Sequence, residues 1–252
     1  FCKQSTSMSI DLEKLDGIGI ITINRPERKN AFTRSQYEDL ASALKDIDTD
    51  DSVHVAIITG AGGAFSSGQD LKEMAEMATA VASGTPASSQ PGGFTVLLDG
   101  LETFSKPLIA AVNGVAVGIG MTLLPFCDIV LIDETARMRV PFSELGVPPE
   151  AASSILFADQ IGWQRAAEIL FTARWIEAPE AVEIGLALRT APQGEVLAHA
   201  VELAKTIASK SAYSTRVIKQ LMVAGRGGRI KEARAREEAL FAELFRSRGF
   251  SS

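Results

Sequence analysis

The first fifty residues change from a strand-like to a helix-like spacing of hydrophobic positions. Residues 17–26 alternate and are rich in isoleucine, which predicts a strand that ends at Pro26. Apolar side chains then recur three and four positions apart from 34 to 48, which predicts an amphipathic helix. A strand followed by such a helix is typical of a fold in which helices pack against a β-sheet.

Two continuous apolar strands are each followed by a glycine-rich loop and a helix. The strand predicted at 53–60 leads into "AGGAFSSGQDLKEM", and the strand at 107–112 leads into "NGVAVGIGM". A third apolar run at 127–133 predicts another buried strand. Because strand, loop and helix recur in this order, the sequence predicts an α/β fold with stacked turns around one core.

The remaining segments are helical or irregular. Residues 79–93 are rich in Ala, Ser, Gly and Pro without periodicity, so we expect a mobile surface loop there. Helices are predicted at 94–105, 151–160, 163–172, 179–184, 194–208, 212–223 and 229–247. Residues 1–9 have no signal-peptide features and are interpreted as a flexible leader or a cloning remnant. We expect a core domain over 10–195 and a helical region over 196–252.

Composition narrows the class of protein. The chain has 252 residues, 46% of them hydrophobic, which is enough for one large folded domain. Its formal net charge of −6 argues against a general nucleic-acid surface. No apolar run reaches the roughly 18 residues of a membrane span, so we expect no membrane partner. These features favour a cytoplasmic protein, in a bacterial cytosol first and an organelle as the alternative.

Few side chains are available for metal or nucleophile chemistry. Cys2 and Cys127 show no paired spacing, so we expect neither a disulfide framework nor a metal site. His54 and His199 both lie in apolar or helical patterns, where a solvated or satisfied core histidine is the simpler interpretation. The glycines of "NGVAVGIG" fit neither a dinucleotide fingerprint nor a P-loop. They either pack a strand closely against a helix or let backbone N–H groups approach a ligand.

The two glycine loops together suggest a polarising site. Each loop presents backbone N–H donors next to a helix start, and two fixed donors can stabilise negative charge that develops on a carbonyl oxygen. Such a site also needs a base. In "PFSELGVPPEAASS", Glu150 is a candidate, although prolines and a carboxylate at this position also predict an ordinary helix start.

Four motifs in order resemble the crotonase superfamily, also called the enoyl-CoA hydratase/isomerase family. They are "NRPERKNAF", "AFSSGQDLKEM", "KPLIAAVNGVAVGIGM" and "CDIVLIDETARMRVPFSELGVPPE", and the resemblance covers about residues 10–247. It implies a spiral of repeated ββα turns and a homotrimer or dimer of trimers built with the C-terminal helical region. It also implies an acyl-CoA thioester substrate without a separate cofactor. The implied oxyanion donors are the N–H groups of Gln69 and Ile119.

The glutamates separate the activities within this family. The enoyl-CoA hydratases carry two catalytic glutamates, but the matching positions here are Thr122 and Phe142. The peroxisomal-type delta-3,delta-2-enoyl-CoA isomerases carry one, and it matches Glu150, followed by Ala151 where the family often has glycine. The resemblance therefore implies isomerisation of 3-enoyl-CoA to 2-trans-enoyl-CoA. A hydratase-like enzyme, another crotonase reaction on an unusual acyl-CoA and a non-catalytic acyl-CoA-binding scaffold are the alternatives.

The resemblance also implies a coenzyme A site, and the nearby acids have simpler roles. The implied CoA-binding residues are Arg28, Lys29, Ala31, Ser67, Gly68 and Lys72, with backbone contacts from several of them and from Gln69. Asp70 is predicted to cap the helix that follows the first loop. Asp128 is predicted to be structural, and Glu144 to have a surface or hydrogen-bonding role.

Overall fold

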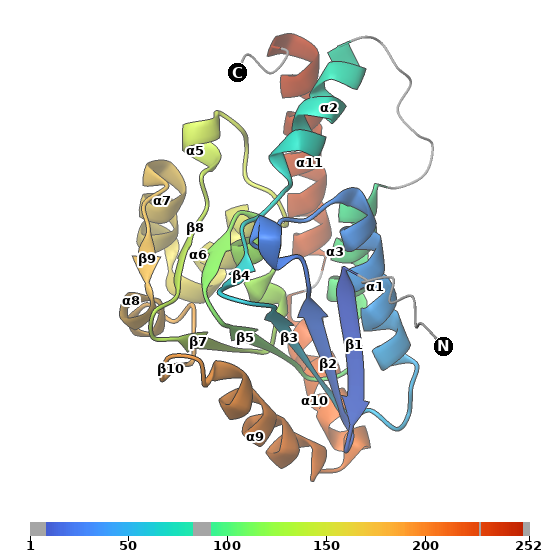
Figure 1. The fold of residues 1–252 in the computed structure, drawn as a ribbon. Coiled ribbons are helices and arrows are strands. Elements are labelled where there is room, and N and C mark those ends of the chain that lie inside the picture. The colour runs from blue at the N-terminus through green and yellow to red at the C-terminus, as the bar shows by residue number, and fades with distance from the viewer. Residues whose placement is uncertain (1–8, 83–91, 227, 249–252) are drawn as a thin grey trace, which may run out of the picture.

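A computed structural model of the chain describes residues 9–82, 92–226 and 228–248. The leader predicted at 1–9 lies outside these residues apart from Ser9, and so does most of the loop predicted at 79–93. The chain forms two sheets with helices around them (Figure 1), as the predicted α/β class requires.

The main sheet has six strands. In spatial order they are β1 (Ile10–Leu15), β2 (Ile18–Ile23), β3 (Val55–Gly60), β5 (Leu108–Val112), β7 (Ile129–Asp133) and β10 (Arg189–Ala191). Only the β1–β2 pair is antiparallel. The strand predicted over 17–26 extends only over Ile18–Ile23, and β1 before it was not predicted. Asp16 and Gly17 join the two strands in a tight turn with φ of 51° and 79°. Asp-Gly adopts such left-handed angles readily, which makes 10–23 a hairpin.

The hydrophobic pattern did not predict the four short strands of a second sheet. Its order is β4 (Ala64–Ser66), β6 (Val115–Val117), β8 (Arg137–Arg139) and β9 (Ile176–Glu177). These strands of two or three residues are too short to produce a periodic pattern in the sequence. Two of them, β4 and β6, lie in the segments that were predicted as glycine-rich loops. Three times along the chain, a strand of the main sheet is followed by a strand of the second sheet and then a helix. This repeat is the predicted ββα turn.

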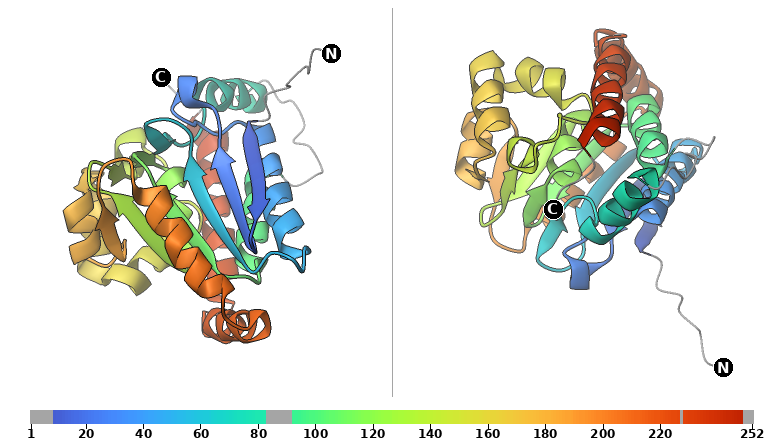
Figure 2. Two further views of the ribbon diagram at one scale, coloured as in Figure 1. Left: turned by 60° about the horizontal axis from the view of Figure 1, so that its bottom comes forward. Right: turned by 90° about the horizontal axis from the view of Figure 1, so that it is seen from above.

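Helices cover both faces of the main sheet. On one face lie α1 (Arg34–Asp48) and α3 (Gly93–Thr103), and on the other lies α9 (Val196–Ala208), as Figure 2 shows. Strand β3 is buried along its whole length because its side chains point alternately into these two cores. Helix α2 (Leu71–Ala82) extends into residues predicted as loop, because the alanines and methionines of 74–82 are good helix formers.

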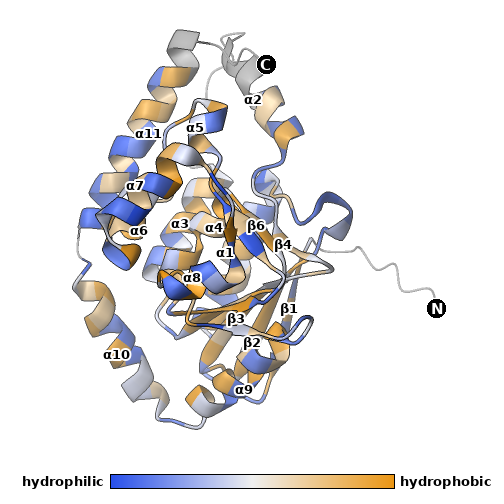
Figure 3. Cartoon of the chain, turned by 90° about the vertical axis from the view of Figure 1, so that its left-hand side faces the viewer, coloured by the Kyte–Doolittle hydropathy of each residue, from blue (hydrophilic) through white to orange (hydrophobic). Residues whose placement is uncertain are grey.

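The helical C-terminal half agrees with the predicted ranges within a few residues. It contains α6 (Ser153–Ile161), α7 (Trp163–Thr172), α8 (Ala178–Glu183), α9, α10 (Ala212–Ala224) and α11 (Arg229–Arg248), and also the short α5 (Phe142–Leu145), which was not predicted. Earlier in the chain lie α4 (Ile119–Thr122) and short 3-10 turns at Pro26–Arg28 and Leu124–Phe126. Figure 3 shows hydrophobic residues concentrated in the strands and on one side of helices such as α9. Glu150 precedes α6 by three residues, so its predicted place in the first turn of a helix is wrong.

Two buried lysines anchor α10 and α1 to the start of β5. Lys106 donates from Nζ to the carbonyl oxygens of Ile47 and Asp50, at 2.6 Å each. Lys219 donates to the carbonyl of Lys106 at 2.8 Å and lies 2.9 Å from Asp128 Oδ2. The same Asp128 oxygen accepts the N–H of Leu108 at 2.7 Å, which confirms the predicted structural role of this acid.

Candidate active site

The two glycine loops cross where β4 and β6 lie side by side. Gly68 and Gly118 have φ of +94° and +53°, angles that other residues adopt at a cost. A methyl group on Gly68 would lie 2.9 Å from the carbonyl oxygen of Val117, and one on Gly118 would lie 3.9 Å from Cα of Gly68. The Gly118 N–H is held by the Arg139 carbonyl at 3.1 Å. The backbones of the two loops are therefore in close contact, and at Gly68 this contact leaves no room for a side chain.

The residues that follow these glycines are Gln69 and Ile119. Ile119 is the first residue of α4, where the backbone N–H has no intrahelical acceptor. Among residues 9–82, 92–226 and 228–248, neither the Ile119 N–H nor the Gln69 N–H is hydrogen-bonded. The structure thus places the residues that follow Gly68 and Gly118 at one crossing of the two loops, each with a backbone N–H that no described residue accepts.

Hydrogen bonds on both sides fix the Gln69 backbone. The Phe32 N–H donates to the Gly68 carbonyl at 2.7 Å, and the Asp70 N–H donates to the Phe32 carbonyl at 2.8 Å. The side chain is held as well, because the Tyr37 hydroxyl donates to Gln69 Oε1 at 2.7 Å. Tyr37 stacks on Phe32 with ring centroids 4.9 Å apart. Burial raises the pKa of Tyr37 well above its ordinary value, and the carboxylates of Glu150 and Glu73 add to this.

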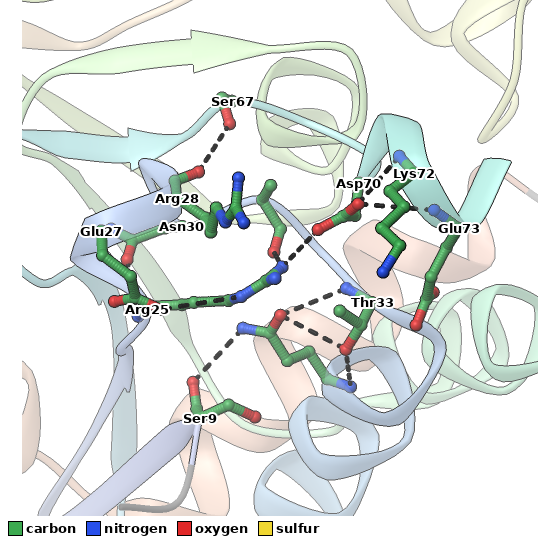
Figure 4. A network of polar contacts seen from close by, with 12 residues as sticks. Ser9, Arg25, Glu27, Arg28, Asn30, Thr33, Ser67, Asp70, Lys72 and Glu73 are labelled. Atoms are coloured by element: carbon green, nitrogen blue, oxygen red, sulfur yellow. Dashed lines mark hydrogen bonds and ion pairs between the residues drawn. The ribbon is translucent and has the colours of Figure 1, made fainter. Parts of the chain in front are cut away.

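Asp70 starts helix α2 and ties it to the neighbouring turn. Its Oδ1 accepts the N–H of Lys72 at 3.0 Å, which confirms the predicted cap. Its Oδ2 lies 2.6 Å from Arg25 Nη1. Figure 4 shows this ion pair as a dashed line. Hydrogen bonding to Arg25, together with the N–H groups of α2, lowers the pKa of Asp70 despite partial burial. Asp70 is therefore ionised at neutral pH, and it links the start of α2 to Arg25.

Five of the six predicted CoA-binding residues lie on two segments that are hydrogen-bonded to each other. The Ser67 N–H donates to the Lys29 carbonyl at 2.9 Å, and the Ser67 hydroxyl donates to the Arg28 carbonyl at 3.2 Å (Figure 4). Ala31 and Gly68 follow within these segments and are buried, whereas the Arg28 and Lys29 side chains are exposed. Lys72 lies apart from this contact, on α2, where its side chain is 85% exposed and 3.8 Å from Glu76. The N–H groups of Ala31 and Ser67 are already engaged within the chain.

Glu150 lies against α4, the helix that begins with Ile119. The Thr122 hydroxyl donates to Glu150 Oε1 at 3.5 Å, a long hydrogen bond. Burial raises the pKa of Glu150 to about 7, the charge of Glu237 adds to this, and the Thr122 hydroxyl opposes it. A carboxyl with this pKa can accept and return a proton near neutral pH.

The other candidate acids and bases have structural partners. Glu144 forms an ion pair with Arg139, which confirms its predicted surface role. The side chains of Thr122 and Phe142 are buried, and neither can replace a carboxylate. His54 contacts the Ala208 carbonyl at 3.2 Å, and His199 lies partly exposed beside Glu195. In the described part of the chain, no three His, Cys, Asp or Glu side chains gather as metal ligands, and no helix is long and apolar enough to cross a membrane.

Two residues near Glu150 and Gln69 were missed by the sequence analysis. Tyr37 was predicted only as part of the buried face of α1, and Glu237 only as part of a C-terminal helix. The signal for Tyr37 is its hydroxyl, since a buried tyrosine usually finds a hydrogen-bond partner. The signal for Glu237 is its spacing, because it continues the buried stripe of Ile230, Ala233 and Arg234 at helical intervals.

Comparison with known proteins agrees with these motifs. A family model described as enoyl-CoA hydratase/isomerase matches residues 13–251. Rat enoyl-CoA delta isomerase 2 is 39% identical over 87% of this chain and 56% of its own length, so the chain spans about half of that relative. A probable enoyl-CoA hydratase, echA8, of Mycobacterium bovis is 32% identical over 95% of this chain and 91% of its own length.

A solved structure has the same fold along nearly the whole chain. The crystal structure of an enoyl-CoA hydratase/isomerase from Pseudoalteromonas atlantica superposes with a TM-score of 0.89 at 30% identity, covering 96% of this chain and 94% of that one. A match of this quality over 96% of the chain confirms the predicted crotonase-like fold. By its motifs, its fold and this likeness, the chain belongs to the enoyl-CoA hydratase/isomerase family, the crotonase superfamily.

Proposed function

We propose that this protein isomerises 3-enoyl-CoA thioesters to 2-trans-enoyl-CoA thioesters, with Glu150 as the only proton carrier. The observation that carries the proposal is the contact between Glu150 and Thr122. It sets the Glu150 carboxylate against α4 at Thr122, which is three residues after Ile119. By the family resemblance, hydratases carry one of their two catalytic glutamates at the position of Thr122. This contact supports Glu150 as the one carboxylate from which the base would act.

The reaction consists of two proton transfers through one group. Ionised Glu150 removes a proton from C2 of the substrate, and the electrons move onto the thioester oxygen to give a dienolate. The N–H groups of Gln69 and Ile119 hold this oxygen, and two fixed donors stabilise the negative charge as it develops. Protonated Glu150 then returns the proton to C4, which leaves the double bond between C2 and C3. Each turnover restores ionised Glu150, so the proposed step uses no cofactor beyond the CoA of the substrate.

The CoA part of the substrate is proposed to bind along the joined segments at Arg28, Lys29, Ala31, Ser67 and Gly68, with Lys72 at the edge. The exposed Arg28 and Lys29 side chains can pair with phosphates in an otherwise acidic protein. The N–H groups of Ala31 and Ser67 are engaged within the chain, and the Ala31 carbonyl accepts from Arg25 Nη1 at 3.2 Å. The carbonyl oxygen of Ser67 is therefore the backbone group that we propose for the ligand.

Self-assembly into a trimer or a dimer of trimers is proposed from the surface of α10. Four large apolar side chains on this helix are exposed, namely Tyr213, Ile218, Leu221 and Met222, with exposed fractions of 57% to 78%. Such a group on one helix marks a surface that another chain can cover. We expect light scattering to give three or six times the mass of one chain. A monomer at micromolar concentration would contradict this.

Two substrates distinguish the proposed isomerase from its alternatives. With 3-hexenoyl-CoA, we expect absorbance at the conjugated thioester band to rise, because isomerisation creates conjugation. With 2-hexenoyl-CoA, we expect little loss of that band, because neither Thr122 nor Phe142 can supply the second acid of a hydratase. Fast loss from 2-hexenoyl-CoA with no rise from 3-hexenoyl-CoA would identify a hydratase instead. CoA binding without either change would identify a non-catalytic binder.

A further inference from the structure

Helix α11 sends one buried carboxylate to the turn that carries Glu150. The Glu237 side chain is 5% exposed. Its Oε2 accepts the N–H of Ala152 at 2.7 Å, and its Oε1 accepts the N–H of Ser154 at 3.1 Å and also the Ser154 hydroxyl. Glu237 therefore caps the start of α6 from a helix about 85 positions away in sequence.

The capped turn has a backbone conformation that its residues do not favour. Ala151 and Ala152 have φ of 57° and 55°, in the left-handed region that suits glycine. The turn also fixes Glu150 directly, since the Ser153 N–H donates to the Glu150 carbonyl at 2.9 Å. A left-handed alanine pair persists where its surroundings hold it, and here these surroundings are the core around both alanines and the hydrogen bond from the Ala152 N–H to Glu237.

Glu237 is itself on a well-anchored helix. Three residues earlier on the same buried stripe, Arg234 pairs with two acids of α3, Asp99 at 2.8 Å and Glu102 at 3.0 Å. Figure 1 shows α11 running beside α3 and α2. The position of the Glu237 carboxylate is thus set by the packing of α11 rather than by the turn that it caps.

We propose that Glu237 is a positioning residue for the catalytic base, holding the left-handed turn at Ala151 and Ala152 so that the Glu150 carboxylate stays beside α4. This inference rests on the proposed role of Glu150. On this proposal, α11 helps to position the catalytic base in addition to packing against the core.

The Glu237 charge also acts on the base through space. The groups that face Glu150 are Thr122 from α4, Tyr37 from α1 and Glu237 from α11. Of these, the negative charge of Glu237 raises the pKa of Glu150, in addition to the effect of burial. Burial likewise raises the pKa of Glu237 itself, and its hydrogen bonds from Ser154 and Ala152 and the charge of Arg236 oppose this. Removing the Glu237 charge should therefore make Glu150 easier to ionise.

The test compares Glu237→Gln with Glu238→Gln in the full chain, using 3-hexenoyl-CoA. A glutamine amide cannot accept hydrogen bonds on both of its ends. Its oxygen keeps more hydrogen bonds at the Ser154 end, where two donors lie, so we expect the Ala152 N–H to lose its acceptor. We expect kcat to fall roughly 10-fold or more while KM changes less than about twofold. We also expect the acidic limb of the pH profile of kcat/KM to move to lower pH. Glu238 is about half exposed and 4.0 Å from Arg234, and its variant should match the native enzyme.

Two further measurements separate failure of this inference from failure of the proposed function. Amide hydrogen exchange at Ala152 should speed up in Glu237→Gln, whatever reaction the enzyme catalyses. In an Ala151→Gly, Ala152→Gly background, which adopts the turn without strain, Glu237→Gln should cost less activity. Unchanged exchange, an unchanged pH profile or an equal loss in both backgrounds would overturn the positioning role. Full activity of Glu150→Gln would instead overturn the proposed function.

Discussion

Replacing Glu150 with glutamine is expected to lower kcat for isomerisation of 3-hexenoyl-CoA by roughly 10³- to 10⁴-fold, the upper range for loss of a general base. The loss is large because the same carboxylate performs both proton transfers. Glutamine has nearly the same size, and the CoA segments lie on other elements, so KM should stay close to the native value. Stopped-flow absorbance at the conjugated thioester band measures both constants.

The matched control for this variant is Glu144→Gln. Glu144 lies on α5 and is 55% exposed in an ion pair with Arg139, so its replacement should leave kcat within about twofold of native. Glu150→Gln with more than a tenth of the native kcat would show that another group moves the proton.

Because the pKa of Glu150 is raised, Glu150→Gln should lose activity but gain stability at high pH. Burial and the Glu237 charge raise this pKa from 4.5 to about 7. Between these pH values native Glu150 holds a proton that the unfolded chain has lost, so stability falls as the pH rises through this window. Glu150→Gln should therefore unfold at a higher temperature than the native protein at pH 8, with the difference shrinking towards pH 5. Native kcat/KM should rise over the same range, as the base ionises.

Replacing Gly68 with alanine is expected to lower kcat by about 10²-fold or more, the effect measured for loss of one oxyanion donor. The added methyl group would lie 2.9 Å from the Val117 carbonyl, at a backbone φ of +94° that alanine disfavours. Because this contact is between two backbones, one loop must move, and the Gln69 N–H moves with it. Steady-state kinetics with 3-hexenoyl-CoA gives the size of the loss.

Gly194→Ala is the control for the backbone strain alone. Gly194 has φ of +77°, but an added methyl group there meets no atom within 4 Å. This variant should lose about 1 kcal/mol of stability, as expected for alanine in the left-handed region, with native kcat. Equal kcat values for the two glycine variants would mean that the crossing of the two loops does not contribute to catalysis.

The hydrophobic pattern predicted most of the main sheet and most helices because these elements are long. Strand β3 is an apolar run between two cores, and α1 has a full amphipathic repeat, so each is specified locally. The hairpin before them was missed, although Asp16-Gly17 is a strong turn signal. The second sheet could not be predicted in this way, because a strand such as Ala64–Ser66 forms only when β6 is beside it.

By itself, the sequence determined which chemistry could be present at the candidate site. It supplied glycines before Gln69 and Ile119, a carboxylate at 150 and none at 122 or 142, because residue identity alone decides which groups can bind a ligand closely or carry a proton. Only the tertiary structure decided how these groups act on one another. It set Gly68 against Val117 and Glu150 against Thr122, and it brought Glu237 to the turn from a distant helix. The pKa of Glu150 follows from that burial and that neighbouring charge, and both exist only once segments far apart in the chain have packed together.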